Sequence, residues 1–144
     1  RRCSHVVATA ALWPLYAAAA YDLGATMRSD EEVRFVIEIE VSDVERFKAI
    51  AAECSAVSRE EPGTLVYDWY LDEATGRARL YEAYESVDAV RAHSAGRVFT
   101  EVGLPLMEVC AFVHVDCFGE VGDLLDAPFW PTTVWGSAFV SSND

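Results

Sequence analysis

The sequence predicts a single α+β domain of the ferredoxin-like type, built on a four-stranded antiparallel sheet. Four stretches have the two-residue apolar period of strands, and two have the three- and four-residue spacing of amphipathic helices. Their order over residues 34–118 is β-α-β-β-α-β, the split βαβ pattern, which places both helices on one face of the sheet. With 144 residues, 52% of them hydrophobic, the chain is of the size and composition expected for one core.

The first strand and helix are expected between residues 34 and 61. Ser42 and Glu45 have the spacing of a capping box, so a helix is expected to begin at Ser42 and to end before Pro62. The strand before it has one wholly apolar face, formed by Phe35, Ile37, Ile39 and Val41. The expected core-facing residues of the helix are Val44, Phe47, Ala51, Cys54 and Val57.

An antiparallel hairpin is expected next, from strands at 64–71 and 77–85 joined by a polar turn that ends in Gly76. One face of the first of these strands is expected to be formed by Leu65, Tyr67, Trp69 and Leu71.

The second helical region is expected to begin with Ser86 as its cap and to run to His93. A break at 94–96 precedes a second helical piece, which is expected to end near Pro105. A fourth strand is expected at 109–118, with one apolar face formed by Val109, Ala111, Val113 and Val115.

The two ends of the chain are expected to lie outside this domain. Residues 1–33 form an N-terminal appendage with a short helix from Ala8 to Tyr21; the charged start and the apolar stretch at 6–20 also resemble a signal peptide cleaved after Ala20. That stretch is interrupted by Pro14 and is too short to span a bilayer, so no membrane helix and a cytoplasmic location are expected. The aromatic tail at 119–144 is expected to pack on the domain or on a dimer partner.

Charge and composition restrict the partners. A net charge of −13 opposes binding to nucleic acid and to anionic membranes. The four cysteines form no CxxC pair and are expected to be buried thiols, and no metal, Walker or dinucleotide motif is present, so no cofactor is expected. The sheet face away from the helices is too apolar to remain in water, which predicts a homodimer.

Three segments, at 61–67, 80–84 and 89–93, read EPGTLVY, LYEAY and AVRAH and together resemble the antibiotic biosynthesis monooxygenase family of dimeric α+β barrels. The resemblance covers about residues 34–118. It implies a homodimer with a pocket between sheet and helices in each subunit; some members oxidise aromatic polyketides or quinols with molecular oxygen and without metal or flavin.

Two departures from the family pattern qualify this resemblance. The oxygenation chemistry of the family is associated with an asparagine beside a tryptophan, whereas the single asparagine here is Asn143. Haem-degrading relatives hold iron through a histidine in the region that corresponds to residues 99–106, where this chain has none, so haem is not expected.

Two residues are candidates for the catalytic groups, namely His93 as a base that deprotonates a phenol or enol, and Glu82 as an acid of raised pKa. Structural roles are the alternatives: His93 as a helix cap or as an anchor of the hairpin, and Glu82 in a structural pair. A flat aromatic substrate would be bound by Tyr67, Trp69, Tyr84 and Phe99, although aromatic residues on strands are commonly core or interface.

Three further polar residues have structural interpretations by default. His114 is expected to be a hydrogen-bonded structural imidazole, and Arg79 and Arg91 are expected to be ion-paired or solvated rather than bound to an acidic substrate.

The leading hypothesis is therefore a cofactor-free monooxygenase of an aromatic polyketide or quinol-like molecule. A non-catalytic dimeric module that binds a small molecule or supports a partner protein, and a proton-transfer isomerase or cyclase, are the alternatives.

Overall fold

The computed structural model describes residues 31–126, 128 and 130–136, and within them it confirms an α+β ferredoxin-like fold with the predicted element order. The predicted helix at 8–21 and Asn143 lie outside the described residues, and the division of the chain at residues 33 and 118 stays a prediction. The elements are β1 (Val33–Val41), α2 (Val44–Ser58), β2 (Thr64–Asp72), β3 (Arg77–Tyr84), α3 (Val87–Ser94), the π-helical turn η1 (Val98–Val102), α4 (Leu106–Val109), β4 (Cys110–Phe118) and β5 (Thr132–Val134).

The sheet has five strands in the order β2-β3-β1-β4-β5, so the prediction of four antiparallel strands is wrong in this respect. The first four strands pair antiparallel, whereas β5 pairs parallel to β4. The extra strand β5 lies in the tail and runs in the same direction as β4. At its start the Pro131 carbonyl accepts a hydrogen bond from the Val115 amide at 2.9 Å. The tail thereby covers backbone groups that the edge of β4 would otherwise leave unpaired.

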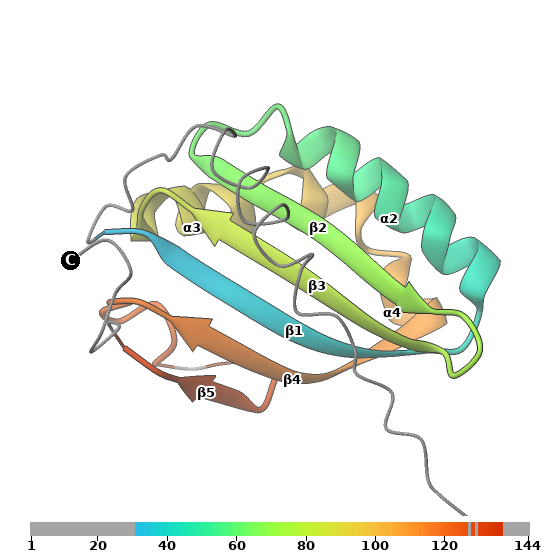
Figure 1. Ribbon diagram of the computed structural model, residues 1–144. Coiled ribbons are helices and arrows are strands. Elements are labelled where there is room, and N and C mark those ends of the chain that lie inside the picture. The colour runs from blue at the N-terminus through green and yellow to red at the C-terminus, as the bar shows by residue number, and fades with distance from the viewer. Residues whose placement is uncertain (1–30, 127, 129, 137–144) are drawn as a thin grey trace, which may run out of the picture.

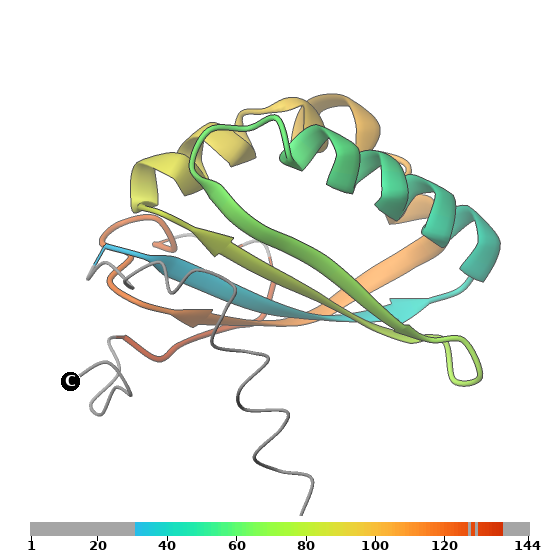
Figure 2. The same ribbon diagram turned by 45° about the horizontal axis from the view of Figure 1, so that its top comes forward.

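The helices cover one face of the sheet, as Figures 1 and 2 show from two sides. Alternate residues of β1 and β3 face these helices and form the core, because successive side chains of a strand point to opposite faces. The core residues that are at most 2% exposed include Val33, Ile39, Phe47, Cys54, Leu80, Tyr84, Val109 and Cys117.

A β-bulge near the start of β2 overturns the prediction that Leu65 shares the apolar face of its strand. The register with β3 shifts between Thr64 and Val66, so Leu65 is an extra residue and is 49% exposed. After the bulge, Tyr67 and Trp69 point to the helix side as predicted, packed against the core.

A second bulge, in β4, overturns the predicted face of that strand. Phe112 pairs with Ile39 and His114 pairs with the preceding residue of β1, so Val113 is extra and is 40% exposed. Ala111 is also exposed, whereas Val115 is buried. A bulge adds one residue to a strand, so the residues beyond it change faces. A sequence pattern of strict period two does not show where such a change occurs.

The predicted capping box at Ser42 is also wrong, since Asp43 caps α2 by accepting a hydrogen bond from the Arg46 amide at 3.1 Å. The Ser42 hydroxyl instead donates to the Val109 carbonyl at 2.9 Å and ties β1 to α4. The predicted cap at Ser86 is confirmed, because its side chain accepts from the backbone N–H three residues later.

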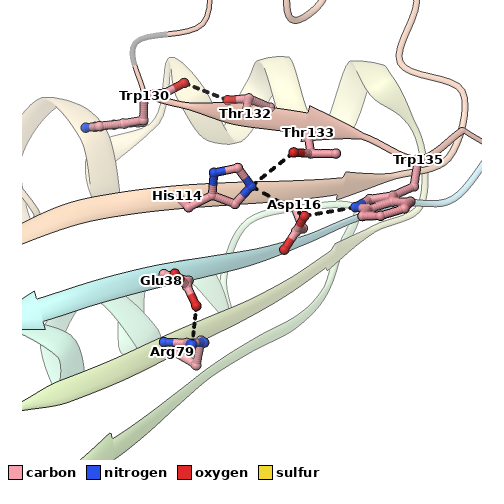
Figure 3. Close-up of polar contacts among 8 residues, drawn as sticks. All are labelled: Glu38, Arg79, His114, Asp116, Trp130, Thr132, Thr133 and Trp135. Atoms are coloured by element: carbon pink, nitrogen blue, oxygen red, sulfur yellow. Dashed lines mark hydrogen bonds and ion pairs between the residues drawn. The ribbon is translucent and has the colours of Figure 1, made fainter.

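The tail is bound by side chains on the face of the sheet opposite to the helices (Figure 3). The Trp135 indole donates to Asp116 at 2.8 Å, and the Thr133 hydroxyl hydrogen-bonds with His114 Nε2 at 3.1 Å. His114 therefore has the hydrogen-bonded structural position that was expected. Beside it, Glu38 on β1 makes an ion pair across to β3.

No helix in the described ranges has the length and hydropathy needed to cross a membrane.

The bulge in β4 predicts unequal effects for two valines that lie two residues apart. Val115→Ala should lower the free energy of unfolding by about 1.5–3 kcal/mol, since it leaves a cavity in the core. Val113→Ala, the matched control, should change it by less than about 0.5 kcal/mol, because the side chain is on the surface. Urea unfolding measures both, and equal losses would contradict the bulge.

Candidate functional site

A cavity of about 490 Å³ lies between the helix-facing side of the sheet and α3. This volume is within the range of small-molecule sites. Its walls come from β1, β3, α3, η1, β4 and the segment after β4, and they are largely apolar. The lining residues from these elements include Phe35, Ile37, Glu82, Val90, Phe99, Val115, Leu124, Leu125 and Trp130.

Glu82 is the acidic group in this lining, and the register of the sheet places it there. On β3 it is opposite Phe35 of β1 and Tyr67 of β2, so its side chain points to the helix side and is only 7% exposed. Burial raises the pKa of Glu82 to about 7, the hydrogen bond from Tyr84 opposes the rise, and the negative charge of Glu61 adds to it. Glu82 is thus able both to hold and to release a proton near neutral pH.

Tyr84 is fully buried and serves as a hydrogen-bond donor to this acid. Its hydroxyl donates to Glu82 Oε2 at 3.1 Å, and burial raises the pKa of Tyr84, so the phenol keeps its proton. This contact uses one carboxyl oxygen of Glu82 and leaves Oε1 for a ligand in the cavity.

His93, on α3, lies behind this layer and does not line the cavity. The side chain is 2% exposed, and Nδ1 makes a short hydrogen bond with the carboxylate of Glu61. Three aromatic rings surround the imidazole, with centroid distances of 5.3 Å to Tyr67, 5.2 Å to Tyr84 and 5.3 Å to Phe99. His93 therefore reaches Glu82 only through neighbouring side chains.

Tyr67 and Trp69 line a second hollow of about 670 Å³ instead, between α2 and the edge strand β2. The ring of Trp69 packs edge-on against Phe47 of α2 at 5.4 Å, and Tyr67 packs edge-on against Trp69 at 5.7 Å. The two aromatic residues thus form part of the wall of this second hollow.

The six residues singled out in the sequence are divided among three positions. Glu82 and Phe99 line the cavity, and Tyr67 and Trp69 line the second hollow. His93 and Tyr84 line neither space and pack against each other.

Sequence reasoning missed Glu61 and the contribution of the tail. Glu61 stands before a Pro-Gly pair, where a surface turn is the ordinary expectation. Trp130 was expected only to pack somewhere on the domain, yet it lines the cavity and packs against Phe112 with a centroid distance of 4.9 Å. The aromatic content of the tail was the available signal.

The two arginines considered as anion-binding residues are ion-paired. Arg79 pairs with Glu38 on the face away from the helices. Arg91 lines the cavity but binds Asp88 and Asp123.

The three cysteines within the described residues are free and buried, as predicted. Burial raises the pKa of Cys54 and of Cys110 to about 11 and that of Cys117 to about 12, so none is a thiolate near neutral pH. In the same part of the chain, no three His, Cys, Asp or Glu side chains are grouped as metal ligands.

Comparison with known proteins gives one family match and several similar structures. The sequence profile of the antibiotic biosynthesis monooxygenase family matches residues 33–102, which include β1 through η1. No curated protein sequence is significantly similar to the chain.

Two solved structures are similar in fold at 18% identity. MupZ from Pseudomonas fluorescens has a TM-score of 0.64, and the match covers 79% of this chain and 98% of MupZ. SnoaB, a cofactor-independent oxygenase from Streptomyces nogalater, has a TM-score of 0.56, with 62% of this chain and 93% of SnoaB covered.

The raised pKa of Glu82 predicts a pH-dependent stability. The folded state holds the Glu82 proton up to about pH 7, whereas an unfolded glutamate loses it near the ordinary pKa of 4.5, so stability is lost as the pH rises through this interval. From about pH 5.5 to about pH 8 the wild type should lose about 2 kcal/mol relative to Glu82→Gln, which carries no charge. Urea unfolding at both pH values measures this, and parallel pH profiles would contradict a raised pKa.

Proposed function

Because residues 33–102 match the sequence profile of the antibiotic biosynthesis monooxygenase family, we propose that the chain is a cofactor-independent monooxygenase of an aromatic polyketide or quinol-like molecule. The observation that carries the proposal is the apolar cavity of about 490 Å³ with the buried acid Glu82 in its wall. The likeness in fold to SnoaB, a cofactor-independent oxygenase, makes molecular oxygen the co-substrate to test.

Glu82 acts first, as the base that removes a proton from the substrate. A phenol or enol bound in the cavity presents its hydroxyl, or the acidic C–H of its keto form, to Glu82 Oε1. A base with a pKa of about 7 is matched to this transfer near neutral pH. The Tyr84 hydroxyl orients the carboxyl from the other side through its hydrogen bond to Oε2.

The apolar walls then hold the substrate anion away from water. Phe35, Phe99 and Trp130 provide aromatic surface for a flat molecule. An anion in such surroundings is a stronger electron donor than in water, because its solvation shell has been removed. It transfers one electron to dioxygen, and the resulting radical and superoxide combine to a peroxide.

Collapse of that peroxide completes a balanced reaction. A methylene group of the substrate and one dioxygen become a ketone and one water. The methylene carbon gives up both hydrogens as protons, together with the four electrons of its two C–H bonds, and dioxygen takes up these electrons and protons. The substrate is thus the reductant, and the protein supplies binding, proton transfer and exclusion of water.

A second candidate function, isomerisation or cyclisation by proton transfer, follows from the same acid in the same cavity. It requires Glu82 to move a proton between two atoms of the substrate and does not require oxygen. Product formation under anaerobic conditions separates the two, since the monooxygenase must stop without oxygen and the isomerase must not.

We further propose that two copies associate through the sheet face that the helices leave uncovered. Of the large apolar side chains on or beside this face, Tyr70 is 58% exposed and Trp135 61%. Sedimentation equilibrium at micromolar concentration should give twice the mass of 15.9 kDa. A monomer at that concentration would contradict the dimer.

Oxygen consumption with an anthrone-type substrate tests the proposed reaction. The wild type should consume one dioxygen per substrate, and Glu82→Gln should lower kcat about 10²- to 10⁴-fold, because the amide cannot accept the proton. Glu85→Gln, an exposed position on the same chain segment, is the matched control and should keep full activity.

His93→Ala should also lower kcat in this assay, since the imidazole packs against Tyr84 behind the acid. Full activity in Glu82→Gln would exclude the role of Glu82, and the absence of oxygen uptake by the wild type would exclude the oxygenase.

A further inference from the structure

Two buried polar atoms of one side-chain pair have no hydrogen-bond partner within the described residues. They are Nε2 of His93 and Oε1 of Glu61, whose other polar atoms bind each other. A buried polar atom without a partner destabilises the folded state, so such an atom in a folded protein calls for an explanation. The pair neighbours Glu82, since His93 packs against Tyr84 and the charge of Glu61 acts on Glu82.

The backbone holds Glu61 against His93. Glu61 follows α2, where its amide donates to the Ser58 carbonyl at 3.2 Å and its carbonyl accepts from the Thr64 amide at 3.4 Å. Its carboxylate enters the space beside Gly96, where a Cβ would lie 2.6 Å from Oε1. A side chain at position 96 would force this carboxylate to shift, so the glycine leaves room for it in its present position.

The bond to Glu61 determines which nitrogen of His93 has the lone pair. A carboxylate accepts hydrogen bonds, so it selects the form of the neutral ring in which Nδ1 carries the hydrogen. Nε2 is then left as an acceptor inside the protein. If Nε2 takes up a proton, the adjacent carboxylate stabilises the imidazolium.

Three aromatic rings and one carboxylate surround the imidazole of His93. From β2 the ring faces Tyr67, from β3 it faces Tyr84 with Glu82 hydrogen-bonded behind it, and from η1 it faces Phe99. Among the described residues, the carboxylate that pairs with the ring is that of Glu61, on the far side.

We propose that Glu61 is a positioning residue that fixes His93, and that the pair stores the proton which Glu82 removes from the substrate. This inference rests on the proposed function. In the balanced reaction the substrate releases two protons and the product water receives two, so protons must be held while oxygen reacts. The first proton passes from Glu82 to His93 Nε2 and later returns to the oxygen that leaves as water. Tyr84 donates to Glu82 and packs its ring against the imidazole, but within the described residues no hydrogen bond joins its hydroxyl to Nε2.

Nuclear magnetic resonance of the ¹⁵N-labelled full chain tests the positioning role without any substrate. The chain has three histidines, so His93→Gln assigns the signals of His93. At a pH where the ring is neutral, the wild type should show Nδ1 protonated and Nε2 unprotonated. Glu61→Leu should lose this form, Glu61→Gln should retain it through its amide oxygen, and Glu60→Gln, an exposed neighbour, should match the wild type.

Oxygen-uptake kinetics test the proton store. Glu61→Gln should lower kcat at least about ten-fold and change KM less than about two-fold, because the amide orients the ring but does not stabilise the imidazolium. A purely structural role of Glu61 would instead leave kcat of this near-isosteric variant unchanged, which overturns the proton store.

Each failure has a separate meaning. A protonated Nε2 in the neutral wild-type ring, or an unchanged spectrum in Glu61→Leu, overturns the positioning role. If Glu61→Leu does not fold, the wild-type spectrum still decides. A wild type that consumes no oxygen overturns the proposed function and the proton store with it, whereas the positioning of His93 is still decided by the spectrum.

Discussion

The burial of one carboxyl group, that of Glu82, is the constraint on which the rest of the site depends. Its position follows from the pairing of β3 between β1 and β2, which turns every second side chain of β3 toward the helices. An unpaired carboxylate in such a place is costly, so the group keeps its proton to a higher pH and accepts a bond from Tyr84. The protein thus gives up stability at neutral pH to keep an ionisable group in an apolar cavity.

The strands and their order could be predicted from the sequence because alternation and turn residues act locally. The errors occur where one residue departs from the alternation: Leu65 and Val113 each occupy a bulge, and each was assigned to one face of its strand with its apolar neighbours. Similarly, Ser42 and Asp43 are both good caps, and the choice between them depends on Val109, which is remote in the chain. The fifth strand was missed because it has only three residues. Its pairing with β4 depends on how the tail is placed beside the sheet, which no local pattern shows.

The site was predictable only as far as it follows strand periodicity. Glu82 was singled out as an acid between apolar neighbours of one strand face, a local property of β3. Its relation to Trp130 and Glu61 depends on where the tail and the loop after α2 are placed, and no local pattern contains that information. Tyr67 and Trp69 point to the helix side as their alternation indicates, yet they line a different space, because β2 is at the edge of the sheet.

The carboxyl groups of Glu61 and Glu82 interact electrostatically, and the structure gives them different partners. The charge of Glu61 is one of the causes that raise the pKa of Glu82, so two ionised groups would oppose each other. Glu61 is paired with an imidazole, whereas Glu82 receives only a neutral phenol hydroxyl. Hence Glu82 is favoured as the protonated acid near neutral pH, whereas the carboxyl of Glu61 is bound to His93. A change in the charge of Glu61 therefore changes the pKa of Glu82.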